Sequence, residues 1–391
     1  AWFESAFIEW QLISNAANYN VYIKSEGGQY RRINKNLVRN YGTYGRADMV
    51  GLKAGKYMFK VVATDGSGSE LSWGVESQWL NVESYDRGGF AHKDGVAVGA
   101  YNNDGTLKAN AQVIYVTDDN FDTVKGTILA GKTASEFVGV GNILKALEKG
   151  LHTDPLCIRI EGTITSCSQL YGDAGALQLK GKNNTIPVNV TIEGIGRDAT
   201  LKSFGIVVVK ANNVEIRNIG FNGFADDGIS IKESVKLWVH NNDIFYGAPG
   251  SAADQSKGDG SLDVKDDSQY CTFSYNHFLD SGKSSLCGMK SESGEHFICY
   301  HHNWFNHSDS RHPRVRAMTV HVYNNYYDGV AKYGIGATTG SNVFVESNFF
   351  RNTNRPMMSS LQGTDATGDG TFSGENGGMI KAFGNVVTGT G

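Results

Sequence analysis

Pairs of apolar residues recur along the second half of the chain at a nearly constant interval. The pairs are Val190/Ile192, Val214/Ile216, Leu237/Val239, Cys271/Phe273, Ile298/Tyr300, Val320/Val322 and Val343/Val345. Their spacing falls within the ~20–50 residues that are typical of architectures in which one structural unit stacks on the next. Because the two members of a pair are two positions apart, both point to the same face of a strand, and we expect that face to be buried.

Each repeat contains short strands and turns, without a helical segment that would form a βαβ crossover. Parallel coils wound along one axis bury the apolar pairs and leave free strand edges only at the two ends. We therefore predict an all-β chain built around a parallel β-helix. Asparagine or an aromatic residue follows each pair, as in NNDIF, YNHF and HHNWF. We expect these asparagines to form ladders at the turns, where they hydrogen-bond the backbone, which is a structural role.

One stretch has the spacing of an amphipathic helix. Residues 134–149 are predicted to form it, and Gly150 supplies a C-terminal stop. Its apolar stripe consists of Phe137, Val140, Ile143, Leu144 and Leu147. Such a stripe needs an apolar partner, and the open end of a stack of strands is one candidate.

The first part of the chain, ahead of the repeat, alternates apolar and polar residues in short segments separated by glycine-rich turns. This spacing fits a small β-sandwich. The run GLKAGKYMFKVVATDGSGSELS at 51–72 resembles the closing strands of a fibronectin type III domain. Residues 81–90 are interpreted as a linker. We therefore divide the chain into a fibronectin type III-like β-sandwich at 1–82 and a β-helical domain at 83–391.

Composition and charge exclude several classes of protein. The chain has 49 Gly but only 5 Pro, with 18 Tyr and 19 Phe, which suits many short strands joined by tight turns. A formal net charge of −4 argues against a nucleic-acid partner, which would need a basic excess. No apolar run approaches the ~20 residues that cross a bilayer, so no membrane partner is expected.

The start of the chain and its cysteines relate to the cellular compartment in which the protein works. The chain begins at Ala1 without a basic-then-apolar targeting signal, which fits either a processed secreted protein or a trimmed chain. Five cysteines are too few for a disulfide scaffold, and no CxxC pair suggests zinc. Pairing of Cys157 with Cys167 would fit an oxidising compartment, and five buried thiols are an equally good interpretation.

Charged residues gather where the repeat is longest. The two longest steps, from Leu237 to Cys271 and from Cys271 to Ile298, mark coils with inserted loops, and loops on a rigid scaffold often carry function. Four charged residues follow one another at intervals of about one coil. They are Asp227, Asp259, Lys283 and Arg311. Because stacked coils lie ~4.8 Å apart, these residues should project from the same side of neighbouring turns.

The alternation of side chains along the strands adds further charged residues to this side of the coils. In LDVK (262–265) the two apolar residues turn inward, so Asp263 and Lys265 turn outward together. In RVR (314–316) the valine turns inward, and Arg314 and Arg316 turn outward. The result is an acidic cluster beside a basic cluster.

Three carboxylates from adjacent turns make an oxygen-only site. Asp227, Asp259 and Asp263 would suit Ca²⁺, which prefers oxygen ligands, better than zinc or a soft metal. Each Asp-Gly dipeptide, taken singly, is better explained as a turn signal. The stacking of three aspartates next to lysine and arginine favours the metal site. Arg314 is equally well explained as a solvated charge or an ion-pair partner.

Four sequence blocks resemble the calcium-dependent pectate lyases of polysaccharide lyase family 1, and the resemblance runs from about residue 83 to near the end. They are GIGRDAT (194–200), NNVEIRNIGF (212–221), DGSLDVKDDSQYCTFSYNHF (259–278) and HHNWFNHSDSRHPRVRAMTVHVYNNYY (301–327), of which the last is the most specific. The resemblance implies a right-handed parallel β-helix and a secreted, monomeric lyase of pectin catabolism with Ca²⁺ as cofactor. One departure is Trp238-Val239-His240-Asn241, where the family often has WIDH.

The resemblance also assigns roles to individual residues. It matches Arg311 to the catalytic base, and Lys283 and Arg316 to basic residues that bind substrate. Lys265 matches a position that contacts substrate in some members. The residues that match the calcium ligands are Asp227, Asp259 and Asp263. Asp226, which is adjacent to Asp227, is an alternative to it for the same ligand position. The histidines His240, His301, His302 and His312 are expected to pack or to form hydrogen bonds.

The implied reaction is β-elimination of α-1,4-linked galacturonan (pectate or polygalacturonate), by a carbon–oxygen lyase that uses calcium and an arginine base. Because arginine is protonated near neutrality, we expect an alkaline activity optimum. Three alternatives remain. A galacturonan hydrolase needs paired carboxylates and a placed water, but neither Arg311 nor calcium. A pectin lyase acts on a neutral ester and should lack the calcium cluster. A non-catalytic β-helix would bind polyuronate without releasing an unsaturated product.

Overall fold

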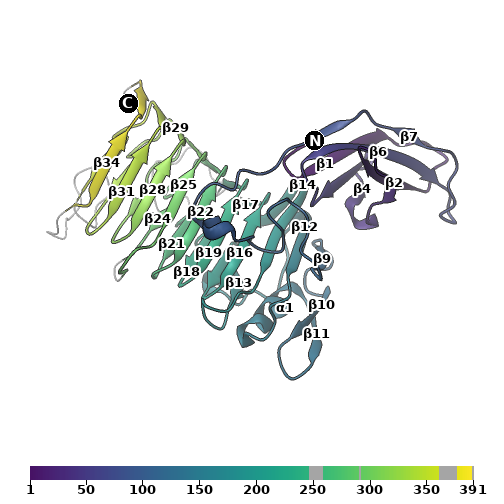
Figure 1. The fold of residues 1–391 in the computed structure, drawn as a ribbon, viewed down its shortest axis with the longest axis horizontal. Helices are drawn as coiled ribbons and strands as arrows, with labels where there is room; N and C mark the ends of the chain where they lie inside the picture. The colour runs from purple at the N-terminus through teal and green to yellow at the C-terminus, as the bar shows by residue number, and fades with distance from the viewer. Residues whose placement is uncertain (246–258, 290–291, 361–376, 390–391) are drawn as a thin grey trace. The chain divides into compact units, whose positions relative to one another are not determined.

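The computed structural model describes residues 1–245, 259–289, 292–360 and 377–389 (Figure 1). The chain forms two compact units, one made of residues 1–87 and 101–109, the other of residues 88–100 and 110–391. Helices are few and short in the described part of the chain, and none has the length and apolarity required to span a bilayer.

The first unit is a small β-sandwich of two antiparallel sheets. One sheet has the order β1 (Ser5–Gln11), β5 (Tyr44–Val50), β4 (Val38–Asn40). The other has the order β3 (Arg31–Arg32), β2 (Asn18–Ser25), β6 (Gly55–Thr64), β7 (Val75–Glu76), and β8 (Leu80–Val82) also pairs with β6. The alternating apolar residues of these strands form the core between the sheets, as Ala6, Ile23 and Phe59 are almost fully buried.

The second unit is a parallel β-helix, and its strands stack in three rows (Figure 1). The first row runs β12 (Leu156–Ile164), β14 (Val190–Lys202), β16 (Asn212–Arg217), β19 (Val235–His240), β22 (Gln269–Ser274), β25 (Ile298–His301), β28 (Thr319–Tyr323), β31 (Asn342–Glu346), β34 (Met379–Phe383). The second runs β17 (Gly220–Asn222), β20 (Asp243–Phe245), β23 (His277–Leu279), β26 (Trp304–Asn306), β29 (Tyr326–Asp328), β32 (Phe349–Arg351), β35 (Val386–Thr388).

The third row of the β-helix has eight strands and carries the candidate site. It runs β13 (Leu177–Lys180), β15 (Ile206–Val209), β18 (Ile229–Lys232), β21 (Leu262–Lys265), β24 (Leu286–Cys287), β27 (Arg314–Val315), β30 (Ile335–Ala337), β33 (Met357–Ser359). β9 (Gln112–Val116) pairs in parallel with β12 and extends the first row at the start of the stack.

The repeated apolar pairs form the core of the β-helix, as predicted. Each pair lies opposite the next in parallel register, so that Val190 pairs with Val214 and Val214 with Leu237. The same register continues through every pair to Val343 and Val345. All fourteen side chains are buried, with exposed fractions between 0% and 3%. The parallel β-helix predicted from the spacing is therefore confirmed.

Asparagines form a continuous ladder at one turn of successive coils. The ladder consists of Asn242, Asn276, Asn303, Asn325, Asn348 and Asn385. In the central rung, Asn303 Oδ1 accepts hydrogen bonds from the backbone N–H and Nδ2 of Asn276, at 3.0 and 3.1 Å. Its own Nδ2 donates to the Phe273 carbonyl and to Asn325 Oδ1, both at 2.9 Å. The predicted structural role of the recurrent asparagines is confirmed.

We expect the Asn303→Ala substitution to lower the free energy of unfolding by roughly 3 kcal/mol or more, because it leaves several buried polar groups of Asn276 and Phe273 without a partner. Urea unfolding measures the effect. The control is Asn354→Ala, since Asn354 is exposed and its side chain makes a hydrogen bond of 3.2 Å to the Ala331 carbonyl. Equal, small losses in both variants would contradict the ladder's role.

The predicted helix is shorter than the sequence indicates. Residues 134–138 form strand β11 (Ala134–Val138), which pairs antiparallel with β10 (Lys125–Leu129). Helix α1 (Val140–Ala146) follows, and a 3₁₀ turn at Leu147–Lys149 ends it. The prediction of a helix from residue 134 was wrong, because backbone pairing with β10 satisfies this segment as a strand. The apolar stripe from Val140 onward is buried in the core of the β-helix and packs against β10 and β13.

All five cysteines are free thiols. Four are buried, and Cys167 is half-buried. Cys157 donates a hydrogen bond to Glu193 Oε1 at 3.3 Å, and burial raises the pKa of its thiol well above the ordinary value.

Candidate active site

Neighbouring coils bring the predicted site residues together on the outer face of the third row. Asp227 precedes β18, Asp259 precedes β21, Lys283 precedes β24 and Arg311 precedes β27. The backbone connects these positions directly, because Gly260 pairs with Lys283, and Lys283 pairs with Ser310. One coil earlier, the Asp259 N–H donates to the Asp226 carbonyl at 3.2 Å. The loops before four successive strands therefore form one wall.

Three aspartates form a tight carboxylate cluster on this wall. Asp226, Asp227 and Asp259 each offer an oxygen within 4.8 Å of the other two. Asp227 is buried, and its Oδ1 accepts a hydrogen bond from the Gly260 N–H at 2.9 Å. Burial and the charges of Asp227 and Asp259 raise the pKa of Asp226. The cluster thus concentrates negative charge and would gain from a bound cation.

Asp263 lies beside this cluster rather than within it. The Lys265 ammonium bridges the two groups, 3.3 Å from Asp263 Oδ2 and 3.2 Å from Asp227 Oδ2. Asp263 Oδ1 also accepts a hydrogen bond from the Leu286 N–H at 2.9 Å. Burial and the charge of Asp227 raise the pKa of Asp263 to about 7. Gly260 makes this close packing possible, because a Cβ at that position would lie 2.3 Å from Asp263 Oδ1.

Basic side chains face the carboxylates from the next two coils. Lys283 Nζ lies 2.8 Å from Asp259 Oδ1. Burial opposes ionisation of Asp259, but the hydrogen bond and charge of Lys283, together with the charge of Arg311, hold its pKa below the ordinary value. Arg316 is buried, and its Nη1 donates to the Met289 carbonyl at 2.9 Å.

The Arg311 side chain is half-buried and makes no hydrogen bond or ion pair with any other described residue. Arg311 lies close enough to Arg314 and Arg316 for their charges to interact. Burial lowers the pKa of Arg314, and the positive charges of Arg311 and Arg316 lower it further. A guanidinium close to the carboxylates, yet unbound by them, is available to a ligand.

Comparison with known proteins shows which family has this arrangement. The sequence profile described as "Pectate lyase" matches residues 75–388, well over half of the chain. The chain belongs to the pectate lyase family.

Individual pectate lyases show how far the similarity extends. A pectate trisaccharide-lyase from Bacillus licheniformis is 34% identical over 234 residues, covering 59% of this chain and 65% of that protein. The chain thus spans slightly less than two-thirds of that relative. Pectate lyase 2 from Pectobacterium atrosepticum is 27% identical over 288 residues, covering 68% of this chain and 75% of its own.

Solved pectate lyase structures share the fold. The structure of a pectate lyase from Bacillus sp. N165 in complex with trigalacturonate matches with a TM-score of 0.56 at 23% identity, covering 78% of this chain and 87% of that one. Pectate lyase C from Erwinia chrysanthemi, in a structure obtained with Ca²⁺, matches with a TM-score of 0.55 at 22% identity, covering 77% and 79%. At these identities the similarity establishes the β-helix.

Within this pectate lyase fold, two of the candidate histidines, His312 beside the site and His240 in the first row, are buried and hydrogen-bonded. His312 follows Arg311 and is fully buried, with its Nδ1 2.8 Å from the Tyr333 carbonyl. Burial lowers the pKa of His312 to about 4. His240 is also fully buried, with its Nε2 3.1 Å from Glu215 Oε1, and burial lowers its pKa. Both are therefore neutral near pH 7 and pack as the sequence predicted.

The low pKa of His312 predicts acid destabilisation. Unfolding restores the ordinary value near 6.5, so His312 contributes stability above that pH and loses it as the pH falls toward 4. We expect the wild type to lose about 2 kcal/mol more than His312→Gln between pH 7.5 and pH 5. Urea unfolding at the two pH values measures this difference. Parallel losses in the two proteins would show that His312 does not titrate in this way.

Two polar residues on the same face of the third row were not singled out from the sequence. Ser230 and Lys232 of β18 lie opposite Asp263 and Lys265 of β21 in the parallel register. The signal was present, because S-I-K at 230–232 repeats the spacing of D-V-K at 263–265 one coil earlier.

Proposed function

We propose that the β-helical domain, residues 83–391, is a pectate lyase that cleaves α-1,4-linked galacturonan by β-elimination. The observation that carries this proposal is the position of the Arg311 guanidinium, which has no partner among the described residues, beside the carboxylate cluster on one wall of the β-helix. Family membership and the named activities of the relatives support the same substrate class.

The carboxylate cluster fits calcium. Its donors are oxygens from Asp226, Asp227 and Asp259, lying within 4.8 Å of one another, and calcium takes oxygen ligands of this kind. We propose these three as ligands, with Asp263 completing the acidic environment. A bound calcium ion would neutralise the carboxylate of the sugar and so favour loss of the neighbouring proton. Burial first, and then the charges of Asp227 and Asp259, raise the pKa of Asp226, and a bound cation would offset both effects.

We propose Arg311 as the base. Its guanidinium, in the deprotonated form, would take the proton from C5 of the sugar next to the scissile bond. The electron pair of the C5–H bond forms the C4–C5 double bond, the C4–O bond breaks, and the departing oxygen takes a proton from solvent. Water is not consumed, and the product is unsaturated. The requirement for a deprotonated guanidinium places the activity optimum well above neutrality.

Three basic side chains would hold the polyanionic substrate. Lys283 and Lys265 now pair with carboxylates of the cluster, and a bound cation would release both for sugar carboxylates. Arg316 can offer a bidentate fork to a carboxylate, which a lysine cannot. These cations also make the surface of the site locally positive. A chain of net charge −4 needs such a surface to bind a polyanion.

The other functions considered from the sequence are less well supported. A hydrolase would leave Arg311 without a role, and a pectin lyase would leave the carboxylate cluster without one. A non-catalytic polyuronate-binding protein would need only the basic residues. We propose in addition that the protein is secreted and monomeric, since its polymeric substrate lies outside cells, and that the β-sandwich is a fibronectin type III-like spacer or docking module.

The test is the release of unsaturated product from polygalacturonate, followed by ultraviolet absorbance. We expect the absorbance to rise with added Ca²⁺. Fully methyl-esterified pectin is the control substrate and should be cleaved at a much lower rate. Cleavage that releases reducing ends without an absorbance change would indicate a hydrolase, and binding without cleavage would indicate a non-catalytic protein.

A further inference from the structure

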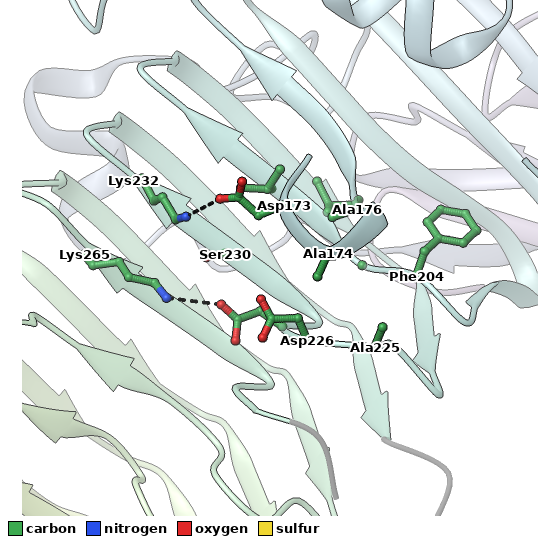
Figure 2. Close-up of a pocket in the computed structure, with 13 residues that line it drawn as sticks. Asp173, Ala174, Ala176, Phe204, Ala225, Asp226, Ser230, Lys232 and Lys265 are labelled. Atoms are coloured by element: carbon green, nitrogen blue, oxygen red, sulfur yellow. Dashed lines mark hydrogen bonds and ion pairs between the residues drawn. The ribbon is translucent and has the colours of Figure 1, made fainter. Parts of the chain in front are cut away.

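A pocket adjoins the carboxylate cluster on the side of the preceding coils (Figure 2). Its walls combine Asp226 and Asp227 with Ser230 and Lys232 of β18 and with the 173–175 turn. Because β18 and β21 are in register, Ser230 is level with Asp263, and Lys232 is level with Lys265. The pocket thus repeats the candidate site one coil earlier, with a serine in place of the aspartate.

The Lys232 ammonium points across this pocket to Asp173 (Figure 2). Its Nζ lies 2.8 Å from Asp173 Oδ2, and the hydrogen bond and charge of Lys232 lower the pKa of Asp173. The Asp173 side chain is 80% exposed, whereas that of Lys232 is only 27% exposed. An ion pair with such an exposed partner contributes little to stability. Another carboxylate can therefore replace Asp173 at small cost.

Ser230 provides an independent indication that the pocket binds a ligand. Its side chain lines the pocket, the residue is 5% exposed, and its hydroxyl has no hydrogen-bond partner among the described residues. Buried hydroxyl groups nearly always have a partner, because leaving one unsatisfied costs free energy. A ligand oxygen that enters the pocket would satisfy the Ser230 hydroxyl.

We propose that this pocket is a uronate subsite, in which Lys232 and the Ser230 hydroxyl bind a galacturonate unit beside the one held at the carboxylate cluster. Asp173 is then the group that the substrate carboxylate displaces. The inference rests on the polyuronate substrate proposed above. A carboxylate ligand is favoured over a neutral sugar, because only an anion can replace the negative charge that Asp173 places next to the Lys232 ammonium.

Substitutions at the pocket should shift substrate affinity in opposite directions. Lys232→Gln should weaken binding of hexagalacturonate about tenfold, as expected for a lost charge-assisted hydrogen bond. Ser230→Ala should weaken it about threefold, and Asp173→Asn should strengthen it about threefold. Asp173→Asn should have no effect when Lys232→Gln is also present. Calorimetric titration with hexagalacturonate in Ca²⁺ measures affinity when every variant also carries Arg311→Lys, so that the ligand is not cleaved. With Arg311 intact, KM on polygalacturonate should follow the same order.

Matched controls separate these effects from general changes in charge. Lys210→Gln removes a lysine that pairs with Glu233 at 3.5 Å, and Asp243→Asn removes an exposed carboxylate on the second row. Both should bind within twofold of the wild type. If Lys232→Gln and Asp173→Asn resemble these controls while the wild type eliminates polygalacturonate, the subsite is wrong and the lyase function stands. If the affinities follow the expected order but no unsaturated product forms, the subsite stands and the proposed function fails.

Discussion

Replacing Arg311 by lysine should lower kcat on polygalacturonate about a thousandfold, within the range that a general base contributes. Lysine keeps a positive charge at this position but cannot place a nitrogen where the guanidinium lies. KM should change less than threefold, because a base acts in the transition state more than in substrate binding. Initial rates of absorbance increase, measured at saturating Ca²⁺ across a range of substrate concentrations, separate the two parameters.

The control for this substitution is Arg351→Lys. Arg351 forms an ion pair with Asp328 at 2.6 Å in the second row of the β-helix, away from the carboxylate cluster. Its substitution should leave kcat within twofold of the wild type. If Arg311→Lys retains most of its activity, Arg311 supplies only charge and another group is the base. An acidic pH optimum of the wild type would remove Arg311 from this role as well.

Removal of calcium should lower the elimination rate at least a hundredfold, because the metal contributes several kcal/mol of charge stabilisation in sites of this type. Excess chelator should abolish the absorbance increase, and added Ca²⁺ should restore it. Asp227→Asn and Asp259→Asn should each require a higher Ca²⁺ concentration for half-maximal rate, because each removes a negative charge from the cluster. The concentration dependence of the initial rate gives this value for each variant.

Stability measurements test the same metal site without relying on activity. A ligand present at a hundred times its dissociation constant stabilises the folded protein by about 2.7 kcal/mol. We expect Ca²⁺ to produce such an increase in the wild type and in Asp243→Asn, but a much smaller one in Asp227→Asn. Equal stabilisation of all three proteins by Ca²⁺ would place its binding site elsewhere.

The apolar repeat predicted the β-helix because it carries two independent signals. Alternation within each pair, such as Val214 and Ile216, gives the face of the strand, and the distance to the next pair gives the coil. The asparagine ladder was equally readable, because Asn303 and its neighbours follow their strands at a constant offset. Both patterns are local and repeated, so one error in a single coil does not alter the conclusion.

The finer geometry of the site depends on register, which residue spacing alone gives only approximately. The step along the chain from Asp227 to Asp259 is one position shorter than the step from Ile229 to Leu262, which pair in the strands that follow. This shift by one position brings Asp226 level with Asp259 and into the cluster. The strand at 134–138 was missed for a different reason, because its apolar residues also fit a helical spacing, whereas the segment pairs with the adjacent β10 as an antiparallel hairpin.

The most direct test of the proposed mechanism is to run the cleavage of polygalacturonate in water enriched in heavy oxygen and to weigh the products. Elimination through Arg311 predicts that each cut gives one new non-reducing end that lacks the mass of one water, and one new reducing end that keeps the oxygen of the glycosidic bond and carries no label from the solvent. Label incorporated at the new reducing ends, with no unsaturated product, would show that the wall of aspartates and cations catalyses hydrolysis instead.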